Sequence, residues 1–236
     1  MGSFIDKYKV LDFIGEGRFG ICYLVSLDEK QYILKEIKRK FIKKDFNKVK
    51  SEGEILSTLD NPFIPKIIDV IENEITYACV LEYIKGKTVE EVIFEDKYVF
   101  SLDEIYKIGI KIINIVKYLH SKNIVHRDIR VPNVILNENN VYLVDFGLAR
   151  FINNKKYRVE DDFSYIGHLL LHLYYTSYES INKKSRPWYE ELTLSLEEKM
   201  FLKRLLGIDE VYKNIYDLER DFLNLENIMT SKKSPL

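Results

Sequence analysis

The residues with the clearest capacity for chemistry lie within 124–150, which reads IVHRDIRVPNVILNENNVYLVDFGLAR. Seven residue types follow the order H-R-D-x-x-x-x-N and D-F-G. At about one in twenty per position, chance gives such a match on the order of 10⁻⁹ per placement. Phosphoryl transfer needs a carboxylate that accepts the proton of an attacking hydroxyl, and oxygen ligands for a metal that bridges the phosphates. Asp128 fits the first role, and Asn133 and Asp145 fit the second.

A glycine-rich segment lies near the start of the chain. Gly15, Gly17 and Gly20 form G-x-G-x-x-G between two predicted strands rather than between a strand and a helix. That context favours a hairpin whose backbone N–H groups approach phosphates closely, because no Cβ intervenes. Taken alone, the motif fits an ordinary tight hairpin equally well.

Lys35 and an acidic residue downstream extend this hypothesis. Lys35 ends the predicted strand YILK, and Glu52 lies in a predicted helix seventeen residues later. An ion pair between them would hold the amine toward the α- and β-phosphates. Glu54 is the alternative partner, although the spacing to Asn61 and Pro62 favours Glu52. A lysine at the end of a strand is by itself usually a surface residue.

The first third of the chain is predicted to be rich in strands. β-branched and aromatic runs are separated by turn residues at Asp28–Glu29 and at 72–74. One helix is predicted over about 44–59, and Asn61–Pro62 ends it. A β-rich lobe of this kind would be joined to the rest of the chain near Lys85–Lys87.

The remainder shows apolar residues at helical spacing. Two capping boxes mark helix starts, one formed by Ser101 and Glu104 and the other by Ser195 and Glu198, and Gly207 marks a helix end. The predicted helices are the run after Ser101, about 162–175, about 196–206 and about 215–225, followed by a loose tail at 229–236.

Composition narrows the classes of function. With 36 Lys and Arg against 37 Asp and Glu, the net charge of -1 favours neither a nucleic-acid binder nor a polyacid binder. Cys22 and Cys79 stand in no metal-binding spacing and favour a reducing compartment. No apolar run approaches the roughly 18 residues of a membrane span, and no secretory signal begins the chain. We therefore expect a soluble cytoplasmic protein without a membrane partner. The richness in Lys, Ile and Asn is typical of an AT-rich genome, such as that of a bacterium.

With GEGRFG, YILK, Glu52, HRDIRVPN and DFG in this order, the chain resembles the eukaryotic-type (Hanks) Ser/Thr protein kinase family over about residues 8–176. The resemblance implies an α+β, two-lobed protein-kinase-like fold. A small antiparallel β-sheet N-lobe carries one main helix, and the C-lobe is larger and mostly helical. The implied single catalytic domain spans 1–236, with the N-lobe at about 1–84, the hinge at about 82–87 and the C-lobe at about 88–228.

The resemblance also implies an activity and its cofactors. ATP and Mg²⁺ would be bound, and the γ-phosphoryl group would pass to a Ser or Thr hydroxyl of a protein substrate that the sequence does not identify. Lys35, Glu52, Asp128 and Arg130 would act in catalysis, and Asn133 and Asp145 would hold the metal. The nucleotide would meet Gly15, Gly17, Gly20, Cys22, Ile33, Lys35, Leu81, Glu82, Tyr83, Ile84 and Ile135.

Structural roles follow from the same resemblance. Leu81 would be the gatekeeper, and 82–84 would be the hinge that meets adenine. Asp162, five residues before Gly167, would anchor the catalytic loop. A packing column between the lobes would be formed by His126, Phe146, Leu56 and Ile67.

Several positions depart from the pattern of the family. Arg130 replaces the Lys of Ser/Thr kinases, although its fork of donors still suits a γ-phosphate, and Pro132 favours a Ser/Thr acceptor. Cys22 and Ile33 replace Val and Ala above the expected adenine, and Ile33 would either tighten the pocket or weaken ATP binding.

The segment after D-F-G is unusually short. Asp162 stands only seventeen positions after Asp145, and the A-P-E motif and the Arg that pairs with its Glu are both missing. Tyr157 is the only hydroxyl between Leu148 and Asp161. We therefore expect no control by threonine phosphorylation here, and we expect Arg127 to pair with a carboxylate such as Glu160 or Asp161.

A basic run covers Lys35–Lys50, with eight Lys or Arg against Glu36 and Asp45. A solvated helix face is the simpler interpretation. The alternative is a docking site for an acidic partner or a nucleic acid that positions Glu52.

Two other functions remain open at this point. A small-molecule kinase resembling choline or aminoglycoside phosphotransferases would also lack a peptide-docking segment. A pseudokinase that only binds nucleotide is the other alternative, motivated by Cys22, Ile33 and the short segment.

Overall fold

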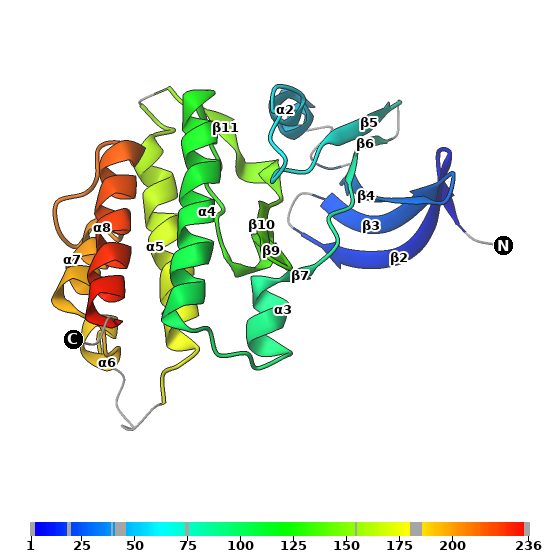
Figure 1. Cartoon of the computed structure of the whole chain (residues 1–236). Helices are drawn as coiled ribbons and strands as arrows, with labels where there is room; N and C mark the ends of the chain where they lie inside the picture. Colours follow the sequence, from blue (N-terminus) through cyan, green and yellow to red (C-terminus); the bar gives the residue numbers. More distant parts are fainter. Residues whose placement is uncertain are drawn as a thin grey trace. The chain divides into compact units, whose positions relative to one another are not determined.

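The computed structural model describes residues 3–17, 20–38, 40, 46–73, 76–153, 155–179 and 186–233, and within these the side chains of 46–49 and 226–233 are not described. The chain divides into two compact units (Figure 1). The first unit comprises Met1–Lys85 together with Val144–Ala149, and the second comprises Gly86–Leu143 together with Arg150–Leu236. The D-F-G segment therefore belongs to the first unit, although it lies far from it in sequence.

The first unit is built on an antiparallel sheet with the strand order β1-β2-β3-β4-β6-β5. A single helix longer than one turn, α2, accompanies the sheet among the residues described in this unit. The elements are β1 (Phe4–Ile5), β2 (Tyr8–Glu16), β3 (Gly20–Leu27), β4 (Lys30–Ile37), α2 (Phe46–Ser57), β5 (Ile67–Glu72), β6 (Tyr77–Glu82) and the short 3₁₀ turn η2 (Phe146–Leu148).

The alternation of side chains along β4 sends neighbouring residues to opposite faces of the sheet. Leu34 enters a core with Tyr8, Val25 and Val80, so Lys35 faces the other side. The hairpin between β3 and β4 turns at Asp28 and Glu29, whose φ angles of 50° and 64° suit a tight two-residue hairpin turn. The register of this hairpin sets Cys22 opposite Lys35.

The second unit is mainly helical and also contains a three-stranded sheet, β10-β9-β7, and a two-stranded sheet, β11-β8. The elements are β7 (Lys87–Thr88), α3 (Val89–Phe94), α4 (Leu102–Ser121), β8 (Ile124–Val125), the 3₁₀ turn η1 (Val131–Asn133), β9 (Val134–Asn137), β10 (Asn140–Leu143), β11 (Arg150–Phe151), α5 (Val159–Tyr175), α6 (Trp188–Glu191), α7 (Leu196–Leu205) and α8 (Ile215–Lys233).

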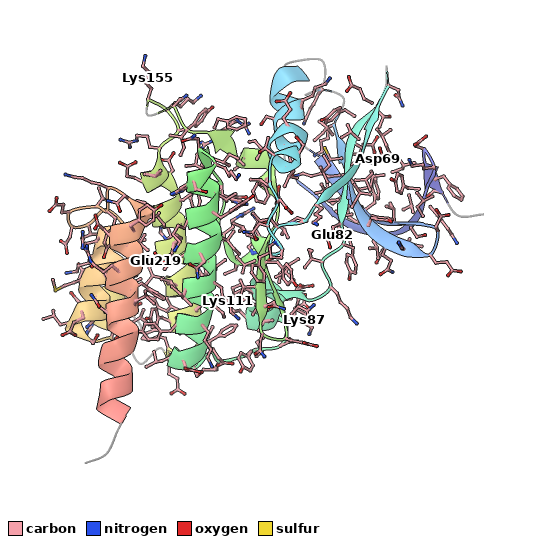
Figure 2. All side chains as sticks on the ribbon, turned by 45° about the horizontal axis from the view of Figure 1, so that its top comes forward. Asp69, Glu82, Lys87, Lys111, Lys155 and Glu219 are labelled. Carbon is pink, nitrogen blue, oxygen red and sulfur yellow. The ribbon has the colours of Figure 1, made fainter. Side chains whose placement is uncertain are left out.

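Helix α4 forms the centre of the second unit and packs against α5 and α8 (Figure 1). A Cβ at Gly109 would come within 2.4 Å of the Phe222 ring, so the absence of a side chain lets α4 and α8 approach closely. Lys117 of α4 also pairs with Glu219, which Figure 2 shows between these two helices. This packing fixes α4, whose C-terminal end leads into β8 and the H-R-D residues.

Both predicted capping boxes are present, and Gly207 has a φ of 70° at the end of α7. Two helix boundaries differ from the prediction. Helix α5 begins at Val159 because Asp161 accepts a hydrogen bond from the backbone N–H of Arg158 and caps an earlier turn. Helix α8 continues to Lys233, so residues 229–233 are helical rather than a tail; no Gly or Pro interrupts the sequence between Leu225 and Ser234.

Candidate active site

In the first unit, Lys35 lies between two carboxylates. Its Nζ is 2.9 Å from both carboxylate oxygens of Glu52 and also forms an ion pair with Asp145 Oδ1. Glu52 is only 5% exposed, whereas Glu54 points to solvent. In the structure, Lys35 therefore pairs with Glu52 and not with Glu54.

The charges of this cluster support one another. Burial by itself lowers the pKa of Lys35, but Glu52 and Asp145 outweigh it, so the pKa lies above its usual value and the amine stays protonated. Burial raises the pKa of Glu52, and Lys35 opposes that rise. Burial also raises the pKa of Cys22 and Cys79 to about 11, so neither thiol ionises near neutral pH.

The D-F-G residues are shaped around Lys35. Asp145 adopts a left-handed φ of 62°, and its carboxylate accepts a hydrogen bond from Gly147 N at 3.2 Å. A Cβ at Gly147 would lie 3.0 Å from Lys35 Nζ, so a larger residue would crowd the amine. The backbone N–H of Phe146 donates to Glu52, which ties α2 to the same turn.

The glycine hairpin is closed by a hydrogen bond from Gly17 N to Gly20 O at 2.9 Å. A Cβ on Gly20 would meet Glu36 O at 2.6 Å, so Gly20 is needed for packing against β4. Among the described residues, no atom lies within 4 Å of a Cβ built on Gly15. Lys38 steadies the loop by donating to Gly17 O at 2.8 Å.

The residues expected around adenine lie mostly in the first unit. Ile33 of β4 pairs in register with buried Leu81 of β6, and Glu82 ends that strand. Glu82 N donates to Lys66 O, so a nucleotide contact at Glu82 would fall to its carbonyl. Tyr83 and Ile84 follow directly after β6. Ile135 belongs to the second unit, on β9 opposite Thr88.

In the second unit, the catalytic loop holds Asp128 by both oxygens. Asn133 Nδ2 donates to Asp128 Oδ2 at 2.8 Å and to the Asp128 carbonyl at 2.9 Å. Arg130 Nε lies 3.0 Å from Asp128 Oδ1, with most of its side chain exposed. The loop therefore presents one oriented carboxylate beside one exposed cation.

The loop is anchored from α5 by Asp162, which is completely buried. Asp162 accepts hydrogen bonds from the backbone N–H groups of His126 at 3.0 Å and Arg127 at 2.7 Å, and it contacts His120 Nε2 at 2.9 Å. Arg127 has a φ of 66°, a costly conformation for a residue with a side chain. The hydrogen bonds to the buried carboxylate of Asp162 stabilise this backbone conformation of Arg127.

We expect Asp162→Ala to lower the free energy of unfolding by about 3 kcal/mol, because two buried backbone donors lose their acceptor. The melting midpoint should fall by roughly 2–4 °C per kcal/mol. Asp103→Asn, at an exposed site on α4, is the matched control and should melt like the wild type. Equal midpoints for both variants would contradict the anchoring role.

Two polar contacts join helices of the second unit. Arg204 pairs with Asp221 at 2.6 Å and stacks on Tyr212 at 3.8 Å. Separately, buried Glu198 accepts hydrogen bonds from the hydroxyls of Tyr106 and Tyr174. Neither contact was predicted from the sequence.

Two predicted sets of residues, the basic run and the packing column, are not described as single groups. Of the basic run Lys35–Lys50, Arg39, Lys43 and Lys44 lie outside the described residues, and the side chain of Lys48 is not described. Of the expected packing column, Leu56 and Phe146 are buried in the first unit together with half-buried Ile67, while buried His126 belongs to the second. Arg127, as expected, faces a carboxylate, with its Nε 3.9 Å from Asp161.

A lysine held by two carboxylates beside a glycine hairpin, and an oriented aspartate in an H-R-D loop, together define a phosphotransferase of the protein kinase class. Comparison with known proteins agrees, because residues 8–192 match the model of the protein kinase domain. The chain belongs to the protein kinase family. The predicted α+β two-lobed fold and the predicted ATP-dependent Ser/Thr protein kinase activity are confirmed.

The chain is similar to several named kinases. It is 36% identical over 226 residues to the probable serine/threonine-protein kinase YbdM of Bacillus subtilis, covering 91% of this chain and 88% of that protein. It is 30% identical to the serine/threonine-protein kinase Nek6 of Oryza sativa, over 63% of this chain and 29% of that protein. It is 33% identical to the carbon catabolite-derepressing protein kinase of Saccharomyces cerevisiae, over 65% of this chain and 25% of that protein.

Proposed function

We propose that Asp128 orients and deprotonates the Ser or Thr hydroxyl of a protein substrate, while Lys35 holds the phosphates of ATP. The observation that carries this proposal is the Lys35 cluster, because Glu52 and Asp145 keep the amine charged and fixed in direction. The family supplies ATP as the phosphoryl donor. The first unit thus contributes most of the groups for the nucleotide, and the second contributes Ile135, Asn133 and the groups for the acceptor.

The acceptor step depends on the second unit's own residues. Asp128 takes the hydroxyl proton, and Asn133 keeps the carboxylate turned by donating to Oδ2. Arg130, exposed and paired with Asp128 Oδ1, is free to swing its guanidinium toward transferred phosphate oxygens. Val131 and Pro132 begin the η1 turn that brings Asn133 back against Asp128.

The donor set also fits Mg²⁺. Asp145 has a half-exposed carboxylate, and Asn133 offers an amide oxygen, which are hard oxygen ligands. Among the residues that the structure describes, no cluster of three or more His, Cys, Asp or Glu could cage a metal by itself. This agrees with Mg²⁺ chemistry, since the ion is usually held by one or two protein ligands together with phosphates and water. When bound, the ion would neutralise phosphate charge.

A screen of acceptors tests the proposal against a small-molecule kinase. ADP release should be measured with a mixture of Ser/Thr peptides and protein and, side by side, with choline and aminoglycosides. We expect release that depends on Ser or Thr and is lost in Asp128→Asn. Turnover with the small alcohols but not with protein would contradict the proposal.

Binding without transfer is the signature of a pseudokinase. ATP and Mg²⁺ would then raise the melting midpoint of the protein while no acceptor gained phosphate.

The remaining proposals concern the location of the protein and its regulation. We keep cytoplasmic location and a regulator at Lys35–Lys50 as predictions. No helix of the described residues is long and apolar enough to cross a membrane.

A further inference from the structure

The segment that follows D-F-G meets Arg127 through an aromatic ring. The guanidinium carbon of Arg127 lies 4.7 Å from the centroid of the Tyr157 ring. The carboxylate of Asp161 also faces this side chain, at 3.9 Å from Arg127 Nε, which is the outer range for an ion pair. Arg127 therefore has the face of Tyr157 as well as Asp161 against its side chain.

The fold of the short segment fixes Tyr157 in this place. Its first residues pair with β8 through β11, and Ile152 N donates to Asn123 O at 2.7 Å. Asn153 then closes a tight loop, because its side-chain oxygen accepts backbone hydrogen bonds from Lys156 at 2.9 Å and Tyr157 at 3.0 Å. The backbone N–H of Asn153 also donates to Tyr157 O. Lys155 projects away from the helices at the tip of this loop (Figure 2).

Helix α5 completes the arrangement from the other side. Asp161 and Asp162 are neighbours in its first turn, where the helix dipole favours carboxylates. Asp162 holds the backbone N–H of Arg127, and Asp161 faces its side chain. Arg127 stands one residue before Asp128, so the direction of its strained backbone sets the direction of the catalytic loop.

We propose that unmodified Tyr157 is a positioning residue that holds Arg127 through its ring, so that this kinase works without a phosphorylated activation segment. The proposal rests on the proposed role of Asp128. It assigns the function to the face of the ring and not to the hydroxyl, since cation–π attraction needs only the ring.

The main rival is a phosphorylated Tyr157. Partial burial raises the pKa of the Tyr157 hydroxyl, but Lys156, Arg150 and Arg127 outweigh it, so the pKa is lowered. Those three cations would also attract a phosphate on the same oxygen. The proposal does not need the hydroxyl of Tyr157, whereas the rival requires the hydroxyl oxygen to carry phosphate.

Three substitutions separate them: Tyr157→Phe, Tyr157→Leu and Tyr157→Ala. We expect Phe to retain kcat within about twofold, and Leu and Ala to lower kcat by about tenfold through loss of the ring face. The KM for ATP should stay within about twofold, because Lys35 and most of the residues expected to meet the nucleotide belong to the first unit. Tyr216→Leu, at an exposed tyrosine of α8, is the matched control.

Each outcome has one meaning. A Phe variant as slow as Leu, with phosphate on wild-type Tyr157 by mass spectrometry, would overturn the proposal in favour of phosphotyrosine. Leu and Ala variants as fast as wild type would overturn it in favour of a passive loop. Melting midpoints identify a variant that fails to fold, and the Phe variant then still decides between the ring and a phosphorylated hydroxyl. An inactive wild type would instead contradict the proposed function.

Discussion

Asp128→Asn is expected to lower kcat by about 10²- to 10⁴-fold, the usual contribution of a general base. Asparagine matches the size of aspartate, so the hydrogen bond from Asn133 and the fold of the loop should largely persist. The amide cannot accept the proton of the acceptor hydroxyl, and the loss should appear in kcat with little change in the KM for ATP. Steady-state kinetics with a Ser/Thr peptide measure both constants.

The control for this experiment is Asp103→Asn, which removes an exposed carboxylate paired with Lys107 on α4. It should leave kcat unchanged. If Asp128→Asn turned over as fast as this control, another group would have to accept the proton.

Lys35→Met is expected to lower kcat by about 10²- to 10³-fold, the typical cost of removing one group that stabilises developing charge. Methionine fills the space of the lysine stem, but it leaves the carboxylates of Glu52 and Asp145 facing each other without a cation. Glu52 should then take up a proton, because burial already raises its pKa. The affinity for ATP should weaken as well, which titration of nucleotide binding would show.

Lys30→Met is the matched control, since Lys30 lies on the same strand with an exposed side chain. Lys30→Met should keep wild-type kcat and ATP affinity. A Lys35→Met enzyme with unchanged kinetics would show that the amine does not act on the phosphates.

Much of the fold could be predicted from the sequence, because local rules decide it. The capping boxes at Ser101 and Ser195 depend only on residues three positions apart, and both helices begin where these predict. The hairpin turn at Asp28 and Glu29 is likewise a local matter. The short strands of the second unit were not predicted individually, since two-residue strands such as β8 have no readable periodicity.

In the candidate site, too, features set by a local motif could be predicted, whereas one contact between residues distant in sequence could not. The predicted roles of Asp128, Asn133 and Asp145 rest on one motif. The spacing already favoured Glu52 over Glu54, and the structure shows that the face of α2 turned toward Lys35 carries Glu52. The contact of Tyr157 with Arg127 joins residues thirty positions apart through a loop closed by Asn153. No spacing rule covers that contact.

Activity without a phosphorylated activation segment is the central claim about this kinase. The most direct measurement is mass-spectrometric mapping of phosphate on the dephosphorylated wild type and Asp128→Asn after incubation with ATP and Mg²⁺. We predict new phosphoserine or phosphothreonine on the wild type, absent from the variant, with Tyr157 unmodified. Stabilisation of the wild type by ATP without any phosphoryl transfer, or transfer that begins only after Tyr157 carries phosphate, would contradict the claim.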